Sequence, residues 1–242
     1  MDAIKITNLT KRYKDLTAVD NLSLTIHEGE LFSLLGVNGA GKTTTIKMLS
    51  CLTSPTEGDA FLLGHSITKE RTAVKELIAV SPQETAVAPA LTVRENLELI
   101  AGIHGFSQEK QNDKIQELAA LLELESVLDK KASKLSGGYQ RRLSIAMALI
   151  SEPKILFLDE PTLGLDVIAR SDLWSIIRAL KSKATIILTT HYMEEAEALS
   201  DRIAIMKEGK LLVCDTADAI KQKTEAKSFE EAFIRIVKEG KQ

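Results

Sequence analysis

GVNGAGKT, residues 36–43, is the stretch that decides the fold of this chain. It follows an apolar run, Leu31 to Leu35, that predicts a strand, and it opens a helix predicted from about Lys42 to Leu52. The pattern G-x-x-x-x-G-K-[ST] between a strand and a helix is typical of a loop that binds nucleotide phosphates. Average residue frequencies would produce the four fixed positions by chance in roughly one chain of this length in a hundred. The sequence therefore predicts an α/β fold built around a phosphate-binding loop.

The residue types in this loop suit the chemistry of a triphosphate. Glycines let the backbone wrap closely, so that successive amides and the positive end of the helix can point at the β- and γ-phosphates. Lys42 adds a positive charge, and Thr43 offers an oxygen to Mg²⁺. The predicted phosphate-binding residues are Gly36, Asn38, Gly39, Ala40, Gly41, Lys42, Thr43 and Thr44.

Composition limits the classes of protein to which the chain can belong. Its 242 residues carry a formal net charge of -3, so non-specific binding of nucleic acid is not favoured. No run approaches the ~18 apolar residues that span a bilayer, and the amino terminus lacks the apolar core of a secretion signal. The two cysteines and four histidines have no metal-ligand spacing. We expect a cytoplasmic chain whose metal arrives with the nucleotide.

A second chemical signal is the run Ile155-Leu-Phe-Leu-Asp159-Glu160, an apolar strand that ends in two carboxylates. Burying a strand that ends in charge is costly unless a cation or a reacting water lies there. We predict that Asp159 holds the Mg²⁺ shell, directly or through water. Glu160, one residue later, is predicted to polarise the attacking water as general base or orienter.

A third signal, LSGGYQRR at residues 135–142, lies shortly before that strand. Ser136, Gly137 and Gly138 stand at the start of a predicted helix, and the amino end of a helix is an anion site. A surface turn that caps a helix would explain the glycines, but not their position upstream of Asp159. The apolar stripe of this helix is Tyr139, Leu143, Ala146 and Ile150.

With these three segments the chain resembles the ATP-binding subunit of an ATP-binding cassette (ABC) transporter, over nearly all of its length. The family signature LSGGQ corresponds to Leu135 to Tyr139, with Tyr139 where glutamine is usual, a departure frequent in exporter-like branches. The resemblance implies a P-loop NTPase (RecA-like) core with an antiparallel β subdomain and an inserted α-helical subdomain. Because the chain's own loop already binds phosphates, it also implies that the signature serves the opposite subunit's ATP, in a head-to-tail dimer.

Four weaker candidates take their roles from the resemblance. Gln83 matches the family's glutamine loop, which touches Mg²⁺ or the lytic water and hinges the helical lobe toward the membrane partner. His191 resembles the switch histidine, whose ring contacts the γ-phosphate. Asp166 resembles the loop that links the two sites across the dimer, and read alone it would be a helix N-cap. Tyr13 matches the aromatic that stacks on adenine; in isolation it is as well explained as a core or surface aromatic.

The remaining pattern predicts how the chain is organised. Thr92 to Glu95 is a capping box that opens a helix from Val93 to His104, and Gln108 to Leu124 repeats apolar residues at helical spacing. We interpret the charge runs Lys69 to Arg71 and Glu194 to Glu197 as solvated helix faces. Strands are predicted at Ile4 to Leu9, Leu22 to Ile26, Leu31 to Leu35, Ala60 to Leu63, Ile78 to Ser81, Ile155 to Asp159, Thr185 to Thr189, Arg202 to Met206 and Leu211 to Cys214.

We expect residues 1–242 to form one ABC ATPase domain with lobes rather than separate domains, since no linker composition interrupts it. The expected parts are a nucleotide-binding core at 1–85 and 151–215, a helical lobe with the signature at 86–150, and a short C-terminal helical tail at 216–242. Within that tail, Ser228 to Gln242 fits an amphipathic helix.

The predicted function is ATP binding and hydrolysis that energises export by separate membrane permease subunits, with ATP and Mg²⁺ bound. Segments such as Glu57 to Gly64, His191 to Ile205 and Ser228 to Ile236 look most like bacterial subunits that serve drug, antibiotic, sodium or polysaccharide exporters. We expect a second ATP-binding subunit, identical or a paralogue, no nucleic-acid partner, and a peripheral position on the inner face of the cell membrane. The alternatives are a soluble cassette ATPase of the iron-sulfur assembly type and the ATPase of an importer.

Overall fold

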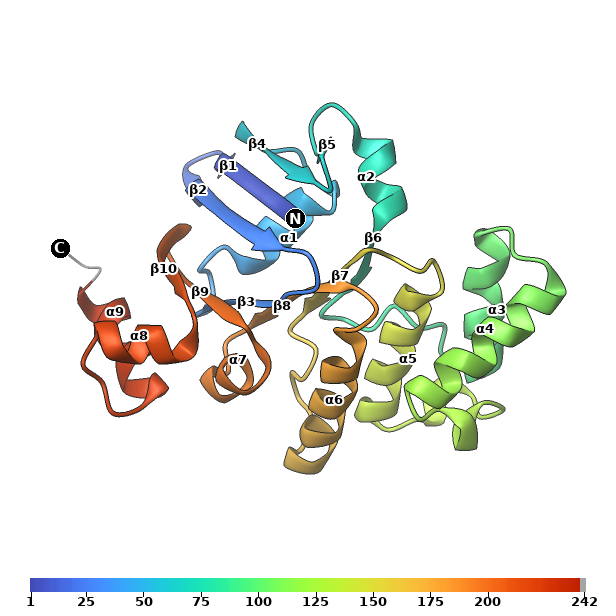
Figure 1. Ribbon diagram of the computed structural model, residues 1–242. Coiled ribbons are helices and arrows are strands. Elements are labelled where there is room, and N and C mark those ends of the chain that lie inside the picture. Colours follow the sequence, from blue (N-terminus) through green and yellow to red (C-terminus); the bar gives the residue numbers. More distant parts are fainter. Residues whose placement is uncertain (240–242) are drawn as a thin grey trace.

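Two β-sheets of different construction form the framework of the computed structural model, which describes residues 1–239 (Figure 1). The larger sheet has the order β10-β9-β3-β8-β7-β6, and all of its neighbours pair in parallel except β10 with β9. Its strands are β3 (Leu31–Gly36), β6 (Ile78–Ser81), β7 (Ile155–Asp159), β8 (Thr185–Thr190), β9 (Arg202–Lys207) and β10 (Lys210–Asp215). The antiparallel sheet, in the order β2-β1-β4-β5, contains β1 (Asp2–Tyr13), β2 (Leu16–His27), β4 (Glu57–Leu62) and β5 (His65–Ser66).

Helices cover the larger sheet and extend beyond it (Figure 1). Strands β6 and β7 pair in parallel although three helices separate them in the sequence, as expected for an inserted helical part. The helices are α1 (Lys42–Leu49), α2 (Arg71–Leu77), α3 (Val93–Ile103), α4 (Gln108–Leu121), α5 (Gly137–Leu149), α6 (Val167–Leu180), α7 (Met193–Leu199), α8 (Ala217–Lys223) and α9 (Phe229–Glu239). Short 3₁₀ turns occur at Glu125–Val127 and Ala132–Lys134. The α/β fold with an antiparallel sheet and inserted helices is confirmed.

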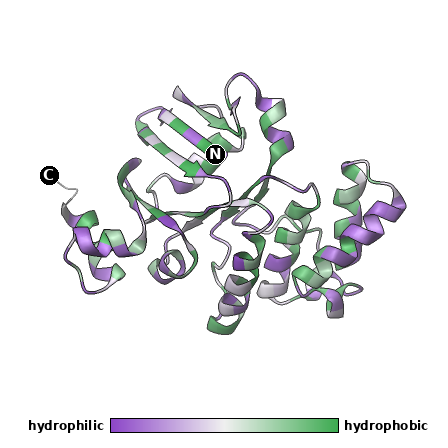
Figure 2. Cartoon of the chain, viewed as in Figure 1, coloured by the Kyte–Doolittle hydropathy of each residue, from purple (hydrophilic) through white to green (hydrophobic). Residues whose placement is uncertain are grey.

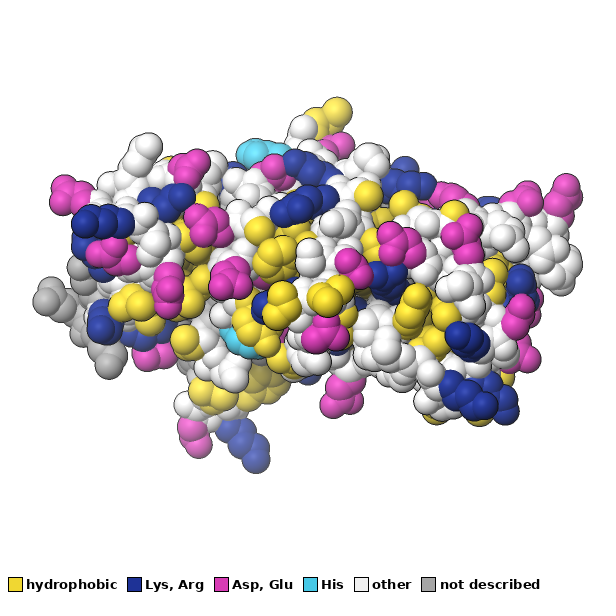
Figure 3. Space-filling view, turned by 90° about the horizontal axis from the view of Figure 1, so that it is seen from below, with side chains coloured by type: hydrophobic (Ala, Val, Ile, Leu, Met, Phe, Trp, Pro, Cys, Tyr) yellow, Lys and Arg dark blue, Asp and Glu magenta, His cyan; other side chains and the backbone are white. Residues whose placement is uncertain are grey.

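Burial explains why the strand predictions succeeded. Every residue of β3, β7 and β8 is buried, which is why these strands are nearly continuous apolar runs. Helices α3 to α5 instead contain both hydrophobic and hydrophilic residues (Figure 2). On the face viewed in Figure 3, acidic and basic side chains are interspersed with hydrophobic ones. Within residues 1–239, no helix has the length and apolarity needed to cross a bilayer.

Local chemistry sets several helix boundaries. The predicted capping box opens α3: the Thr92 hydroxyl accepts from the amide of Glu95 at 3.1 Å, and the Glu95 carboxylate accepts from the amide of Thr92 at 2.7 Å. Helix α1 ends at Leu49 and not at Leu52 as predicted, because Cys51 adopts a left-handed conformation with φ 57°.

Three further predictions need correction or limits. Helix α4 stops at Leu121, before the predicted end, and Glu123 then turns left-handed with φ 54°. Strand β5 was not predicted, because it is short and polar, and of the run Lys69 to Arg71, interpreted as a helix face, only Arg71 lies in a helix, as the first residue of α2. The predicted tail helix is present as α9, whose Phe229 and Phe233 are buried; residues 240–242 of that prediction lie outside the described part.

Candidate active site

The loop between β3 and α1 needs glycine at two positions for steric reasons. A Cβ on Gly36 would lie 2.4 Å from the carbonyl oxygen of Met206, so β9 passes too close for a side chain. Gly41 has φ +100°, and a Cβ there would lie 2.5 Å from the carbonyl oxygen of Ala18. These contacts give a physical reason for both glycines of the motif.

This loop forms one wall of a cavity of about 520 Å³. Gln83, Glu160 and His191, which the sequence placed in catalytic roles, line the same cavity. They follow β6, β7 and β8, and the sheet order β3-β8-β7-β6 brings the carboxyl ends of these four strands together here. The complete lining is Leu16, Ala18, Asn38, Gly39, Ala40, Gly41, Lys42, Thr43, Thr44, Gln83, Glu160, Leu163 and His191.

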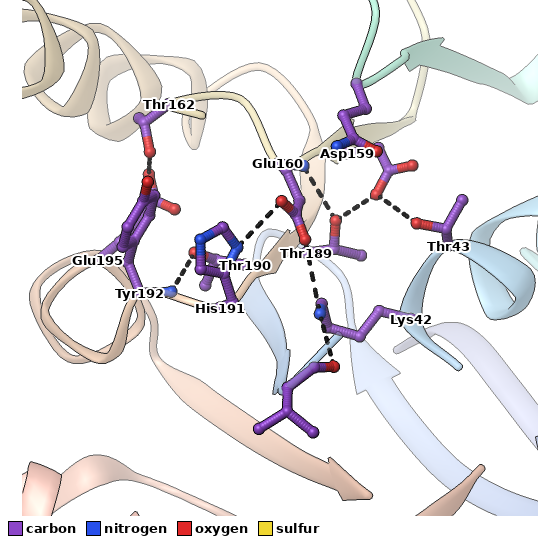
Figure 4. Close-up of polar contacts among 12 residues, drawn as sticks. Lys42, Thr43, Asp159, Glu160, Thr162, Thr189, Thr190, His191, Tyr192 and Glu195 are labelled. Atoms are coloured by element: carbon purple, nitrogen blue, oxygen red, sulfur yellow. Dashed lines mark hydrogen bonds and ion pairs between the residues drawn. The ribbon is translucent and has the colours of Figure 1, made fainter. Parts of the chain in front are cut away.

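The carboxylate of Glu160 lies between two side chains, one from the start of α1 and one from the turn after β8 (Figure 4). Its Oε1 lies 3.5 Å from the Nζ of Lys42, and its Oε2 lies 3.0 Å from the Nδ1 of His191. Its backbone is left-handed, with φ 46°, a conformation that costs energy in a non-glycine residue. Lys42 also donates to the carbonyl oxygen of Gly36 at 2.8 Å, and burial lowers its pKa against the opposing effect of Glu160. The carboxylate is therefore fixed in direction at the cavity wall.

Asp159 is held by two hydroxyls. Its Oδ1 accepts from Thr43 at 3.2 Å and from Thr189 at 2.5 Å. Thr189, which is fully buried, also accepts from the amide of Glu160 at 3.0 Å, so one hydroxyl contacts both acidic residues. Thr189 was not predicted as a site residue, because its only signal in the sequence is a hydroxyl in an apolar strand. A hydroxyl, a carboxylate and the amide of Gln83 at one cavity match the oxygen preference of Mg²⁺.

The metal would need further ligands from the nucleotide. Among residues 1–239, no group of three or more His, Cys, Asp or Glu side chains could hold a metal ion alone. Mg²⁺ usually binds through one or two protein groups together with phosphate oxygens and waters. The residues present therefore fit a metal that enters with a triphosphate.

The signature segment lies away from this cavity. Ser136 caps α5 by accepting from the amide of Tyr139 at 3.5 Å, and neither it nor Gly137 and Gly138 line the cavity. Gly138 packs on the first turn of α6, where an added Cβ would lie 3.3 Å from the Cβ of Ala169. The start of α5 is thus a capped helix end outside the cavity that its own phosphate-binding loop lines.

Asp166 and Tyr13 lie at the edges of the site. Asp166 caps α6, accepting from the amides of Ile168 at 3.0 Å and Ala169 at 2.9 Å, which confirms the N-cap interpretation. Tyr13 is 45% exposed at the end of β1 and pairs in register with Leu16, which lines the cavity. The ring does not itself line the cavity, and the Nζ of Lys11 lies over it, 4.9 Å from its centroid.

Arg141 is a second residue that sequence reasoning missed. It lies on α5, is 5% exposed, and donates to the carbonyl oxygens of Pro82 at 2.7 Å and Gln83 at 2.6 Å. Burial lowers the pKa of its guanidinium. The helix that begins with the signature therefore holds the backbone of the Gln83 loop. The signal in the sequence was only its position next to LSGGYQ.

One interpretation of the charge runs is wrong. Glu194 and Glu197 are exposed, as expected of a solvated helix face, but Glu195 between them is fully buried. Helix α7 turns Glu195 inward together with Ala196 and Leu199. A run of similar residues does not reveal which member points to the core.

Comparison with known proteins agrees with this geometry. The family model described as "ABC transporter" matches residues 19–163, more than half of the chain. The "Nod factor export ATP-binding protein I" of Burkholderia lata is 42% identical over 208 residues, covering 86% of this chain and 68% of that protein. The human "Phospholipid-transporting ATPase ABCA3" is 42% identical over 224 residues, and this chain spans only 13% of its length.

Solved structures show the same fold. An ATP-binding subunit of an ABC transporter has a TM-score of 0.85 at 27% identity, covering 97% of this chain and 99% of the other. A dimeric ATP-binding cassette in a post-hydrolysis state, bound to ADP and Pi, has a TM-score of 0.79 at 30% identity, covering 88% of this chain and 98% of the other. The chain belongs to the ABC transporter family and is one of its ATP-binding cassettes, an ATPase.

Proposed function

We propose that this cassette binds two ATP molecules between two head-to-tail copies and uses their hydrolysis to energise export through membrane subunits. The observation that supports this most is that Lys42, Thr43, Glu160 and His191 line one cavity, with Asp159 bonded to Thr43 at its edge and the signature outside it. A site that lacks its second anion-binding element within one chain is completed most simply by a second chain.

The chemistry of the proposed reaction follows from the side chains present. The loop amides and Lys42 bind the phosphates, and Glu160 orients the attacking water and accepts its proton at a carboxylate oxygen. His191 keeps Glu160 directed at the cavity through the 3.0 Å contact of Nδ1 with Oε2. Mg²⁺ held by Thr43, Asp159 and Gln83 would neutralise charge on the phosphates.

Exposed apolar side chains support the dimer. Val167 and Ile168, directly after Asp166, are 72% and 75% exposed. Large apolar residues next to a charged loop are typical of surfaces that bind another protein. We propose that the second cassette covers them, which would bring its phosphate-binding loop to Ser136.

A membrane partner is proposed at the Gln83 side of the molecule. Leu99 and Ile103 on α3 are 49% and 71% exposed, and Arg141 ties the Gln83 loop to α5. A movement of the Gln83 loop on closure of the nucleotide site would therefore also move α5 and the surface beside it. The direction of transport is proposed from relatives named for Nod factor export and phospholipid transport. A cassette serving such a partner would sit in the cytoplasm, on the inner face of the membrane.

Experiments can distinguish two alternative functions from this proposal. A soluble cassette ATPase of the iron-sulfur assembly type would co-purify with no polytopic protein from detergent-solubilised membranes. The ATPase of an importer would co-purify with a permease and require a binding protein for stimulation. An export cassette co-purifies with its permease. With that permease it lowers the amount of substrate inside the cell when ATP is present, and it needs no binding protein.

The proposed catalytic role is tested by Glu160→Gln, which keeps the shape of the side chain and removes its capacity to accept a proton. We expect ATP binding to persist while the ATPase rate falls by about 100-fold or more, because general-base catalysis contributes on that scale. Since hydrolysis no longer opens the dimer, ATP with Mg²⁺ should shift the variant from monomer to dimer in light scattering coupled to sizing. ADP in place of ATP serves as the control. An unchanged ATPase rate would remove Glu160 from its role.

A further inference from the structure

Glu195 is a buried acid with no function in the scheme above. It is fully buried on α7, and its Oε2 is the one buried side-chain oxygen or nitrogen within residues 1–239 that has no hydrogen-bond partner. In the same part of the chain it forms no ion pair within 4.0 Å. Burying an unpaired carboxylate is expensive, so such a residue needs a reason.

The other oxygen of Glu195 joins three segments of the chain. Oε1 accepts from the hydroxyl of Thr162 at 2.8 Å and from the indole Nε1 of Trp174 at 3.0 Å. Thr162 belongs to the segment that follows β7, Trp174 to α6, and Glu195 to α7. Thr162 is itself buried, so this contact is protected from water. The acid therefore connects the carboxyl end of β7 with the helix that follows β8.

These connections close a circuit around the catalytic pair (Figure 4). Glu160 stands two residues before Thr162, and His191 stands four residues before Glu195. Two segments, or arms, join these residues: 160–162 and 191–195. Hydrogen bonds stiffen both: the amide of Leu163 donates to the carbonyl oxygen of Glu160 at 3.2 Å, and the amide of Ala196 donates to that of Tyr192 at 3.2 Å. The circuit is completed where His191 meets Glu160 at 3.0 Å. A break at Thr162 and Glu195 would let the two arms move independently.

We propose that Glu195 is a positioning residue: by binding Thr162 it holds the segment after β7 against α7 and so fixes Glu160 relative to His191. The inference rests on the proposed function in one respect, namely that this pair acts on ATP. Burial raises the pKa of Glu195, and the hydrogen-bond donors Thr190, Thr162 and Trp174 oppose the shift. A neutral side chain of the same shape that keeps an acceptor oxygen can replace it.

Matched variants separate this role from simple packing. Thr162→Val removes the hydroxyl and keeps the shape of the side chain, so it opens the circuit at one atom. Thr162→Ser and Glu195→Gln keep a donor and an acceptor at that contact and are the conservative variants. Trp174→Phe removes the bond from α6 together with part of the indole ring, but leaves the contact between Thr162 and Glu195 in place, which makes it the control.

Two readouts are needed, and only one depends on activity. The first is kcat and KM for ATP. The second is the ¹⁵N signal of the His191 ring at fixed pH without nucleotide, assigned among the four histidines by its loss in His191→Gln. We expect Thr162→Val to lower kcat by about tenfold or more with KM unchanged, because small misplacements of catalytic groups are costly. The same variant should shift the His191 signal. Thr162→Ser, Glu195→Gln and Trp174→Phe should resemble the wild type in both readouts.

The contrary results are distinct. A Thr162→Val protein with the wild-type kcat and His191 signal, even if it unfolds at lower temperature, assigns the contact to packing alone and overturns the proposal. A lower kcat without a shift of the His191 signal also overturns it, because the effect would not pass through the pair. If the wild type does not hydrolyse ATP, the proposed function fails, while the His191 signal still tests the circuit.

Discussion

At the scale of single residues, the proposed catalytic role of Glu160 depends on how tightly its backbone and carboxylate are held. Its backbone is left-handed, its two carboxylate oxygens face Lys42 and His191, and its amide donates to Thr189. The restraints come from the start of α1, through Lys42, and from the end of β8, through Thr189 and His191. A strained backbone persists only where its surroundings over-determine it, and this arrangement meets that condition.

Thr189→Val tests the hydroxyl that contacts both acidic residues. Valine matches the shape of threonine but offers no donor, so Asp159 loses its 2.5 Å hydrogen bond while the amide of Glu160 keeps the carbonyl oxygen of Thr189. We expect a weaker response to Mg²⁺, with half-maximal ATPase activity at about tenfold higher concentration, because groups that orient metal ligands contribute on this scale. Thr189→Ser is the control. Equal Mg²⁺ responses in all three proteins would count against a role for the hydroxyl.

The pH dependence of stability tests the protonation of Glu195. Burial raises its pKa in the folded state, opposed by Arg170 and by the hydrogen-bond donors around it. Below the ordinary carboxyl pKa of about 4.3, the folded and unfolded chains both carry the proton. As pH rises from there through the raised pKa, the unfolded chain loses the proton first, and the contribution of Glu195 to stability is lost.

Glutamine at this position does not titrate. The free energy of unfolding of Glu195→Gln should therefore rise relative to that of the wild type as pH rises from 5 to 8. Urea unfolding at several pH values measures this difference. A difference that stays constant with pH would mean that burial does not raise the pKa.

The residues that sequence could predict are those with chemistry written into a local motif. Lys42, Thr43 and Asp159 come together as expected, since each is fixed by a strand and the turn that follows it. Thr189 and Glu195 could not be predicted, because their roles depend on which neighbouring strand or loop they meet after folding. The run Glu194 to Glu197 even suggested the opposite of what Glu195 does.

At the scale of elements, α5 connects the signature with the Gln83 loop. The helix begins after the Ser136 cap, and one turn later Arg141 donates hydrogen bonds to the carbonyl oxygens of Pro82 and Gln83. Ser144 on the same helix contacts Ser81 at the end of β6 at 3.0 Å. A displacement of the signature end of α5 therefore reaches the residue proposed to touch the metal and the membrane partner.

Arg141→Met tests this coupling. Methionine preserves much of the apolar stem but leaves two loop carbonyls without their donor, and hydrogen bonds to a charged group contribute about 2 kcal/mol each. We expect a lower unfolding temperature and a slower ATPase, with ATP binding to the isolated chain retained because the phosphate-binding loop is untouched. Fluorescent ATP binding and calorimetry measure the two effects. Loss of ATP binding together with activity would contradict the assignment of Arg141 to the Gln83 loop.

Element types followed from the sequence better than element ends. The buried strands β3, β7 and β8 are apolar runs and were predicted nearly to the residue. Strands β1 and β2 extend beyond their predictions, because they pair with irregular register through polar residues that carry no alternating pattern. The end of α1 depends on one left-handed residue, Cys51, which has no distinctive sequence signal.

At the scale of the whole molecule, the proposed dimer makes the cassette one half of a catalytic unit. Of the two segments proposed to bind ATP, only the phosphate-binding loop lines the cavity where Glu160 and His191 meet, and the signature lies outside it. Sequence could suggest this arrangement only through resemblance to a family, since no local pattern says which chain an anion site serves. The exposed Val167 and Ile168 add a structural reason to expect a second copy.

Complementation between two inactive variants tests this claim most directly. Lys42→Ala disables the phosphate-binding loop, and Ser136→Arg disables the signature, so each protein alone should be inactive. In a mixed dimer, the intact loop of one chain faces the intact signature of the other, which restores one of two sites. We predict that mixing equal amounts restores ATPase activity, up to about a quarter of the wild-type rate for random pairing. If the mixture stays as inactive as its components while each still binds its partner, the site is not shared between chains.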